Sequence, residues 1–434
     1  MNTPAGSDTG TDTEQRRDPD GGPGPVSEAG PGGGRRPGGL TEPGDAPFTD
    51  APAGPGAGPA TPGPRARAGR IAGTALCALA ALWALNTVLR TAFSGRWWLW
   101  NGIDLAPPLA YLAVPLALLL PAALLRRRRR ITLPLLVLAL LLGAGQSGIH
   151  PGALLRDRGP VPADALRVVT WNTFFWHQDA DPDRFFDYLR RYDADVYLLQ
   201  EYQNARGDRP VPIDDLARLR AAFPGYRIAT DGAFLTLSRH PVTLRRALRP
   251  AGLPPPPTDW PDYWNVRVVR TDIEVDGRTL SLYNTHLPDL LNVDRNPLTP
   301  SYYREVGSHA HRRQLHLRAL RADLDANPNP VVLGGDLNTL PGSADLRWFR
   351  GLRDTAESGT DLYPATFPAG PAALWRLDWT FASPDVEIHR QSLDDPPAGL
   401  STHRLILLRL SPPDRPPAGA DGDRTGPDDP KALP

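Results

Sequence analysis

Cysteine, lysine and net charge are the features this 434-residue sequence has least of. The single cysteine, Cys77, excludes an intrachain disulfide, so the fold must depend on its hydrophobic core. Lysine occurs once, at Lys431, and the other basic residues are arginines. The 48 basic and 48 acidic residues balance, which argues against a protein that binds polyanions through bulk electrostatics. We therefore expect no stable nucleic-acid partner.

Aliphatic residues are almost absent from the two ends of the chain. Residues 1–68 are rich in Gly, Pro, Asp and Thr, and residues 412–434 have a similar composition. Such segments cannot bury enough apolar surface to offset the entropy of an ordered chain. We therefore predict a disordered tail at each end.

Long hydrophobic runs are confined to residues 69–150. Three of them, about 71–89, 103–125 and 131–149, are each near the ~20 residues that a helix needs to cross a bilayer. We predict three transmembrane helices, because prolines inside such helices are tolerated. A cleaved signal peptide would explain the first run, but not the two that follow it.

Arginines precede the first hydrophobic run and fill positions 126–130, between the second and the third. The positive-inside rule places both groups in the cytoplasm, and an odd number of spans then puts the C-terminal domain outside. The predicted location is the cell membrane, with three spans, a cytoplasmic N-terminus and an extracellular domain. A nucleic-acid patch is the weaker interpretation of positions 126–130, since lipid flanks them on both sides.

Polar side chains stand in or beside several strand-like runs between residues 165 and 411. The run 331–338 is an apolar strand that delivers Asp336 and Asn338, two residues apart and so on one face, to its exit loop. Other runs each carry one polar residue, with Asp378 expected inside strand 374–381 and His403 before strand 405–408. The polar residues of the remaining runs are Asn172, Glu201 and His286.

Each of these residues also has a purely structural interpretation. Asn172 could cap a turn, and Glu201 could be a solvated carboxylate at the rim of the domain. His286 could be a structural histidine, and Asp378 could bridge only to Arg376. Six independent coincidences would be needed for all the structural interpretations to hold together, so a shared site is the stronger hypothesis.

These runs, in this order, resemble the endonuclease/exonuclease/phosphatase superfamily, the group of DNase I, apurinic endonucleases, inositol phosphatases and neutral sphingomyelinases. The resemblance covers about residues 165–411 and includes the strand 234–238 with the Ser-Arg-x-Pro sequence that ends at Pro241. It implies an α+β fold, the four-layer α/β/β/α sandwich of DNase I, with the active site at one end. Residues 181–192 and 311–324 are predicted helices.

The resemblance also implies a metal-dependent phosphoesterase. Mg²⁺, or Mn²⁺, would be bound by Glu201 and Asn172, since a hard cation prefers oxygen ligands. Asp336, aligned by Asn338, would activate the attacking water. Asn172 and Asn338 would also contact the phosphate.

Two histidines complete the predicted site. His403 would face the phosphate as a cation, with Asp378 holding its tautomer, and His286 would bind a phosphate oxygen. Most relatives have an aspartate where this sequence has Thr402, so a second acidic contact to the cation is missing. A site with one metal ion is therefore expected.

Two loops distinguish this chain within the predicted sandwich. The proline-rich segment 250–264 holds Trp260, Tyr263 and Trp264, and segment 289–308 is a polar insertion after His286. The aromatic residues could contact lipid or a prenyl chain, or they could simply cover the edge of the sandwich.

The leading hypothesis is a membrane-anchored extracytoplasmic phosphoesterase that hydrolyses a phosphate, pyrophosphate or phosphodiester bond of a lipid-linked envelope substrate at the bilayer. Three spans followed by this domain resemble the bacterial VanJ-like membrane proteins, a group linked to glycopeptide-antibiotic resistance. An extracytoplasmic nuclease and a catalytically inactive binding module remain the alternatives.

Overall fold

The computed structural model describes residues 63–413 except 126–127, 157–158, 208, 292–294 and 370–371. The predicted disordered tails lie almost entirely outside the described residues. Helix α1 (Pro64–Phe93) already includes residues 64–68, which were assigned to the N-terminal tail. Pro64 occupies the first helical position, where its fixed φ angle suits a helix and its missing N–H costs no hydrogen bond.

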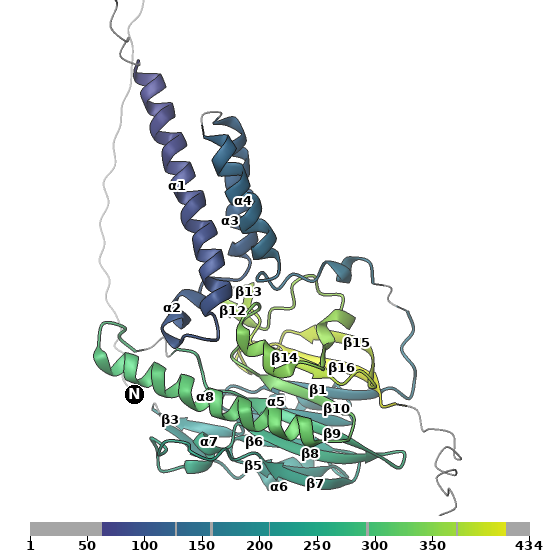
Figure 1. Ribbon diagram of the computed structural model, residues 1–434. Helices are drawn as coiled ribbons and strands as arrows, with labels where there is room; N and C mark the ends of the chain where they lie inside the picture. The colour runs from purple at the N-terminus through teal and green to yellow at the C-terminus, as the bar shows by residue number, and fades with distance from the viewer. Residues whose placement is uncertain are drawn as a thin grey trace, which may run out of the picture. The chain divides into compact units, whose positions relative to one another are not determined.

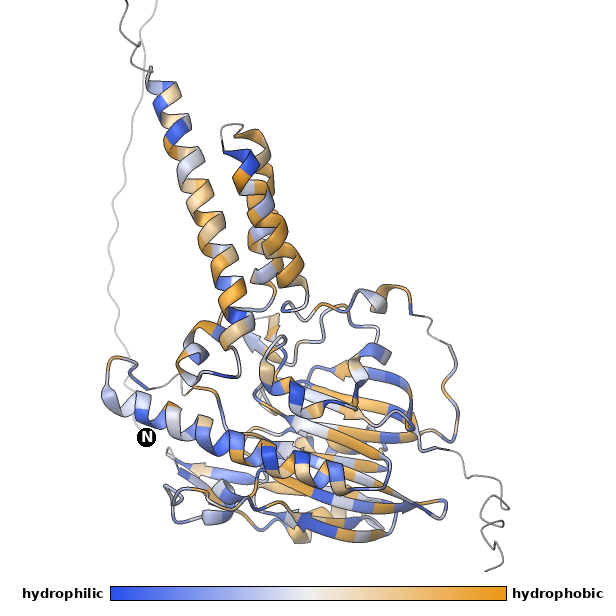
Figure 2. Ribbon diagram, in the orientation of Figure 1, coloured by the Kyte–Doolittle hydropathy of each residue, from blue (hydrophilic) through white to orange (hydrophobic). Residues whose placement is uncertain are grey.

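Three apolar helices precede the sandwich: α1, α3 (Ala110–Leu124) and α4 (Arg129–Ala144) (Figure 1). Within the described residues, α1 is the one helix long and apolar enough to cross a membrane. Figure 2 shows that all three carry many hydrophobic residues. Their outward faces expose large apolar side chains, such as Leu82, Leu120 and Leu141, a property typical of a surface that contacts lipid or another protein.

The second and third predicted spans differ from the observed helices. The short helix α2 (Asn101–Asp104) is separated from α3 by Pro107 and Pro108. Proline lacks an N–H donor and restricts the residue before it, so a continuous helix over 103–125 does not form. With 15 and 16 residues, α3 and α4 are shorter than predicted, and α4 ends at Ala144 rather than at residue 149.

The end of α1 is fixed to the rest of the protein through Arg90, whose side chain is fully buried. Its guanidinium donates to Asp104 Oδ1 at 2.9 Å and to the carbonyl oxygen of Pro341 at 2.9 Å. The N–H of Ala344 donates to the carbonyl oxygen of Ser94 at 3.1 Å. The helix end is thus bonded to the loop that follows a central strand of the sandwich.

Two six-stranded sheets form the sandwich within the described part of the chain. β1 pairs with β2 and β9 pairs with β10 in parallel, and the other neighbours in both sheets are antiparallel. The first sheet, in spatial order, contains β15 (Glu387–Asp394), β16 (Leu405–Ser411), β1 (Leu166–Asn172), β2 (Val196–Gln200), β6 (Phe234–Ser238) and β5 (Arg227–Asp231). The second contains β11 (Arg353–Asp354), β14 (Asp378–Ala382), β10 (Val331–Asp336), β9 (Arg278–His286), β8 (Val268–Val275) and β7 (Val242–Ala247).

Helices cover the outer face of each sheet. The amphipathic helix α5 (Pro182–Arg190) and helix α6 (Leu216–Ala222) bury their apolar sides on the first sheet, and α8 (Pro300–Ala326) packs on the second. A third hydrophobic cluster fills the space between the sheets. These layers confirm the predicted α+β fold and its α/β/β/α sandwich. The smaller elements among the described residues are α7 (Pro261–Asn265), the hairpins β3 (Gln203–Arg206) with β4 (Arg209–Pro212) and β12 (Phe367–Ala369) with β13 (Ala372–Trp375), and the short 3₁₀ helices Trp98–Trp100, Pro151–Leu154, Ala344–Phe349 and Thr355–Ser358.

Two predicted elements within the sandwich were wrong in extent. The predicted insertion 289–308 belongs to α8 from Pro300 onward. The helix begins at Pro300 rather than at the predicted residue 311, because proline suits the first helical position. The predicted strand 374–381 is two strands, β13 and β14, with Asp378 at the start of β14 rather than inside a strand. The N–H groups of residues 377 and 378 donate to Thr366 Oγ1 at 3.1 and 3.0 Å instead of continuing a ladder.

Candidate active site

Three strand ends of the second sheet place polar side chains in one row. Asp336, the last residue of β10, lies opposite His286 of β9 on one side and opposite Asp378 of β14 on the other. Residues directly opposite each other on neighbouring strands project from the same face of a sheet. The row therefore brings together three residues that are separated by up to 92 positions in the chain.

Gly335 makes the close approach of β9 and β10 possible beside this row. Its φ angle is +142°, and a Cβ atom at this position would lie 1.9 Å from the carbonyl oxygen of Thr285. No other residue fits such a position, because every other side chain begins with that atom. Glycine at 335 thus lets the strand deliver Asp336 beside His286.

The first sheet contributes Asn172, at the end of β1, and Glu201, directly after β2. The side-chain nitrogen of Asn172 donates to Glu201 Oε1 at 3.1 Å and to Asp336 Oδ2 at 3.0 Å, so it joins the two sheets. Its oxygen accepts the N–H of Phe174 at 3.0 Å, so Asn172 also caps a turn, as its structural interpretation suggested. Glu201 is 9% exposed and is not a solvated rim residue.

A left-handed segment supports Glu201. Phe174, Phe175 and Trp176 have φ angles of 52°, 62° and 53°, and Glu201 itself has a φ of 60°. For residues with a Cβ this conformation costs ~1–2 kcal/mol each, and such strain tends to occur at functional sites. The geometry aims the N–H of Phe175 at Glu201 Oε2, at 2.9 Å.

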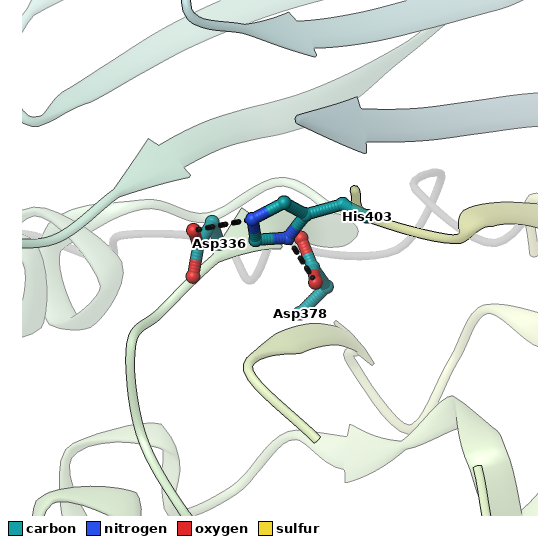
Figure 3. Close-up of side chains that lie close together, drawn as sticks. All are labelled: Asp336, Asp378 and His403. Carbon is teal, nitrogen blue, oxygen red and sulfur yellow. Dashed lines mark hydrogen bonds and ion pairs between the residues drawn. The ribbon is translucent and has the colours of Figure 1, made fainter. Parts of the chain in front are cut away.

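His403 lies between Asp336 and Asp378 (Figure 3). Its Nδ1 donates to Asp378 Oδ2 at 2.8 Å, and its Nε2 is 3.9 Å from Asp336 Oδ2. Burial alone would lower the pKa of His403, but the charge of Asp378 and the hydrogen bond to it, then the charges of Asp336 and Glu201, raise the pKa to about 9. His403 is therefore an imidazolium at neutral pH.

The pairing of Asp378 with His403 decides between two interpretations of that aspartate. Arg376 bonds to both carboxylate oxygens of Asp354, at 2.7 and 2.6 Å, and not to Asp378. Ser401 fixes the loop around the histidine, since its Oγ donates to the carbonyl of Asn172 at 2.8 Å and accepts the N–H of His403 at 2.9 Å. The interpretation of Asp378 as a partner of Arg376 alone is wrong.

His286 has free capacity to bind a ligand. Its Nε2 is 3.7 Å from Asp336 Oδ2 and 4.0 Å from Glu201 Oε1, and its buried Nδ1 has no hydrogen-bond partner among the described residues. Burial lowers the pKa of His286, while the charge of Asp336 opposes this. A histidine with a purely structural role would have both ring nitrogens bonded, so the geometry favours a binding role.

Asn338 aligns Asp336 through its backbone. With a φ of 44°, its N–H donates to Asp336 Oδ1 at 2.8 Å. Its side-chain nitrogen donates to the carbonyl of Leu287 at 3.0 Å and to Asp289 Oδ1 at 3.1 Å. Both side-chain hydrogens are thus used within the protein, which leaves no donor for the phosphate contact predicted for Asn338.

The charge balance of the site fits a divalent cation. Three buried carboxylates, those of Glu201, Asp336 and Asp378, face one imidazolium, that of His403, which leaves two negative charges. Burial raises the pKa of Glu201, and burial and then the charge of Asp378 raise the pKa of Asp336; the charge of His403 opposes both rises without cancelling them. A divalent cation bound by oxygen ligands would supply that charge.

A second grouping of possible metal ligands contains Asp336, Asp378 and His403, whose ligand atoms lie within 4.8 Å of one another. Its imidazole is a poor ligand here, because Nδ1 is bonded to Asp378 and the ring is protonated. The side of Asp336 that faces Glu201 and Asn172 is the better cation site, as predicted for Glu201. Thr402 is exposed and adds no acidic ligand.

The protonation of His403 predicts a pH dependence. The hydrolysis rate should fall as pH rises through about 9, the pKa of His403, because only the protonated ring opposes the phosphate's charge. The Asp378→Asn variant loses the largest contribution that raises the pKa of His403. The pH at which the rate falls should therefore move toward 6.5, the ordinary pKa of histidine. The measurement is kcat between about pH 6 and pH 10 at saturating metal for both proteins. An unchanged midpoint in the variant would contradict this assignment.

Three supporting features had weak or no signals in the sequence. Asp289 follows the His286 motif but belongs to a segment that was interpreted as an insertion. Thr366, which positions Asp378 through its hydroxyl, lies in a run without a recognisable pattern. The positive φ angles of residues 174–176 occur at aromatic residues, where nothing in the composition indicates them.

Comparisons with known proteins identify the family of this chain. The model of the Endonuclease/Exonuclease/phosphatase family matches residues 169–409, which is more than half of the chain. Similar solved structures include an endonuclease/exonuclease/phosphatase family protein from Leptotrichia buccalis and a mannosyl-6-phosphatase from Bacteroides thetaiotaomicron, each with 16% identity and a TM-score of 0.41. A 3′ phosphatase from Neisseria bound to a product DNA hairpin has 16% identity and a TM-score of 0.40.

Each of these three comparisons covers 57% of this chain and 100% of the other. No curated protein matches the chain. The match to the family model extends from β1 to β16 and so includes every residue of the site described above. The chain belongs to the endonuclease/exonuclease/phosphatase family, a family of hydrolases that act on phosphoester bonds.

Proposed function

We propose that this protein is a membrane-anchored, extracytoplasmic, Mg²⁺-dependent phosphoesterase whose substrate is a lipid-linked phosphate, pyrophosphate or phosphodiester of the cell envelope. One observation carries the catalytic part of the proposal. Asp336 is buried 3.9 Å from Nε2 of the His403 imidazolium, and the side-chain nitrogen of Asn172 donates to both Asp336 and Glu201.

The side chains of the site divide the chemistry among them. When bound, a divalent cation supplies positive charge that neutralises the phosphate oxygens. Asp336, held by the N–H of residue 338, accepts a proton from the attacking water. His403 presents a fixed positive charge to the phosphoryl group, and Asp378 keeps it protonated and oriented. His286 offers its unpartnered nitrogen to a phosphate oxygen.

The membrane part of the proposal rests on the apolar helices. A helix of 30 residues, such as α1, is ~45 Å long and exceeds the ~30 Å hydrocarbon core. We propose that α3 and α4 pack beside it in the same layer, which makes three helices in the membrane. Arg128, Arg129 and Arg130, at the start of α4, favour a cytoplasmic position for that end of the helix and an extracellular position for the sandwich.

The attachment of the sandwich at the end of α1 supports the proposal of a lipid-linked substrate. Trp97, next to that end, is 44% exposed, and tryptophan favours the interface between lipid and water. An active site held at this level would meet substrates at the bilayer surface. The resemblance to VanJ-like membrane proteins suggests the same class of substrate and, through it, a part in glycopeptide-antibiotic resistance.

The full chain in detergent or lipid nanodiscs would test the proposal. The substrates are a polyprenyl pyrophosphate, a polyprenyl phosphate, phospholipids, sphingomyelin, single-stranded DNA and RNA, each assayed with Mg²⁺ and with chelator. We expect Mg²⁺-dependent release of phosphate or headgroup from a lipid substrate and none with chelator. Hydrolysis of nucleic acid alone would show a nuclease instead. Binding of a lipid without turnover in any metal would show an inactive binding module.

A further inference from the structure

Arg267 extends the row of catalytic side chains by one strand. It directly precedes β8, and its carbonyl oxygen accepts the N–H of His286 at 3.0 Å. Val268 lies opposite Thr285 in the same antiparallel pair, so Arg267 lies opposite His286. Opposite residues share a face, and the side chain of Arg267 therefore leaves the sheet beside the imidazole of His286.

Within the described residues, no ion pair joins the guanidinium of Arg267 to a carboxylate. The residue is 3% exposed, and its Nε has no hydrogen-bond partner. It lies over the rings of Tyr263 and Trp264, with its central carbon 4.3 and 5.4 Å from the two ring centroids. Aromatic faces attract a cation but do not use its N–H donors.

Most other buried arginines of this protein are paired. Four of them form ion pairs with aspartates: Arg270 with Asp272, Arg90 with Asp104, Arg313 with Asp345 and Arg376 with Asp354. Arg312 lacks a carboxylate but donates to the carbonyl oxygens of Pro254 and Pro255. A buried guanidinium with an unused donor, such as the Nε–H of Arg267, is costly unless a ligand binds it.

Electrostatic effects agree with the position beside the catalytic row. Burial lowers the pKa of His286, the charge of Asp336 opposes this, and the charge of Arg267 adds to the lowering. Burial raises the pKa of Tyr263, and the charge of Arg267 opposes that rise, while Asp289 and Glu201 add to it. The guanidinium is thus close enough to influence both the imidazole and the aromatic residue that faces the site.

We propose that Arg267, supported by Tyr263 and Trp264, forms a second phosphate subsite next to the catalytic one, and that the substrate carries two adjacent phosphoryl groups. This inference rests on the proposed function and narrows it to pyrophosphate-type substrates. Neighbouring strands are ~4.8 Å apart, so the backbone of Arg267 lies one strand from His286 and two from Asp336. Its long side chain and planar N–H donors suit two oxygens of the phosphate beside the one attacked.

Hydrolysis at such a site adds one water across a phosphoanhydride. The water oxygen forms a bond to the phosphorus held between Asp336 and His403, and its proton passes to Asp336. The bond from that phosphorus to the bridging oxygen breaks, and the phosphate on Arg267 departs with the bridging oxygen and its electron pair. A monophosphate would leave the guanidinium unpaired, so the site should select against it.

Binding of two stable analogues tests the subsite without turnover. Methylenebisphosphonate and methylphosphonate are titrated by calorimetry into the Mg²⁺-loaded full chain in detergent. Wild type should bind the bisphosphonate ~10- to 100-fold more tightly, as expected for hydrogen bonds to a charged group. In Arg267→Gln this ratio should fall close to one, while the affinity for methylphosphonate stays unchanged.

Two further variants make the result specific. Arg245→Gln removes an exposed arginine of β7 and should retain the wild-type ratio. Arg267→Lys keeps the charge but not the planar donors, so its ratio should be intermediate. It also serves as the folded reference if Arg267→Gln melts early. An unchanged ratio in both Arg267 variants would overturn the subsite.

Failure of the subsite and failure of the proposed function give different results. If wild type hydrolyses a lipid monophosphate or diester with Mg²⁺ but binds both analogues equally, the phosphoesterase stands and the second subsite is wrong. If the binding ratio depends on Arg267 but no phosphoester or anhydride is hydrolysed in any metal, the subsite stands and the enzymatic proposal is wrong.

Discussion

Asp336→Asn is expected to lower kcat for metal-dependent hydrolysis by ~10²- to 10⁴-fold, the range typical of a lost general base. The substitution keeps the shape of the side chain but removes its ability to accept a proton at neutral pH. No neighbour can replace it, because Asp378 is bonded to His403 and Glu201 accepts the N–H of Phe175. The measurement is steady-state kinetics with the best substrate of the panel.

A measurement of thermal stability shows whether the lower kcat of Asp336→Asn comes from the lost base or from unfolding of the protein. The pKa of Asp336 is raised above 3.8 by burial and by Asp378, so at neutral pH its charge destabilises the folded state. With chelator, Asp336→Asn should therefore melt no lower than wild type. The matched control is Asp323→Asn, whose carboxylate accepts hydrogen bonds from Tyr283 at 2.7 Å and from Arg270 at 3.4 Å. That variant should melt earlier yet keep its kcat, and full activity of Asp336→Asn would refute the assigned base.

His403→Ala is expected to lower kcat by ~10²- to 10³-fold, as for the loss of one group that stabilises transition-state charge. It should also destabilise the protein, because Asp378 stays buried without the partner that donates to it at 2.8 Å. Removing one partner of a buried pair costs about 3–5 kcal/mol. The measurements are kcat and the free energy of unfolding in denaturant, both with the full chain.

A double variant tells the two effects of His403 apart. In Asp378→Asn with His403→Gln both charges are removed and a hydrogen bond between neutral side chains replaces the ion pair. The free energy of unfolding should recover most of its loss, while kcat stays low. Recovery of kcat together with stability would mean that His403 acts only by supporting the fold.

The site could be found from the sequence because its main residues stand where apolar runs end. Asn172, Glu201, His286 and Asp336 each follow four or more residues that read as a buried strand, and each is at or next to a strand end in the structure. The carboxyl ends of parallel neighbours, such as β9 and β10, lie at the same edge of a sheet. Local patterns in the sequence therefore sufficed to predict that these residues lie close together.

Other parts depended on contacts that no local pattern contains. In the sequence, Arg267 looks like any surface arginine that precedes a strand. Only its position opposite His286 in the β8–β9 pair distinguishes it. The break between β13 and β14 involves hydrogen bonds from the N–H groups of residues 377 and 378 to Thr366, a contact that no local pattern indicates. Two successive prolines, Pro107 and Pro108, interrupt the second apolar run, whereas the single prolines Pro115 and Pro121 lie inside α3.

The hydrogen bond from Arg90 to the carbonyl of Pro341 ties the anchor to the chemistry, since Pro341 is five positions after Asp336 in the chain. Cleavage between the helices and the sandwich would keep Arg90 with Asp104 but remove its guanidinium from the carbonyl of Pro341. In the membrane topology proposed above, mechanical disturbance of the bilayer, by thinning or by lateral pressure, would reach the same short stretch of backbone.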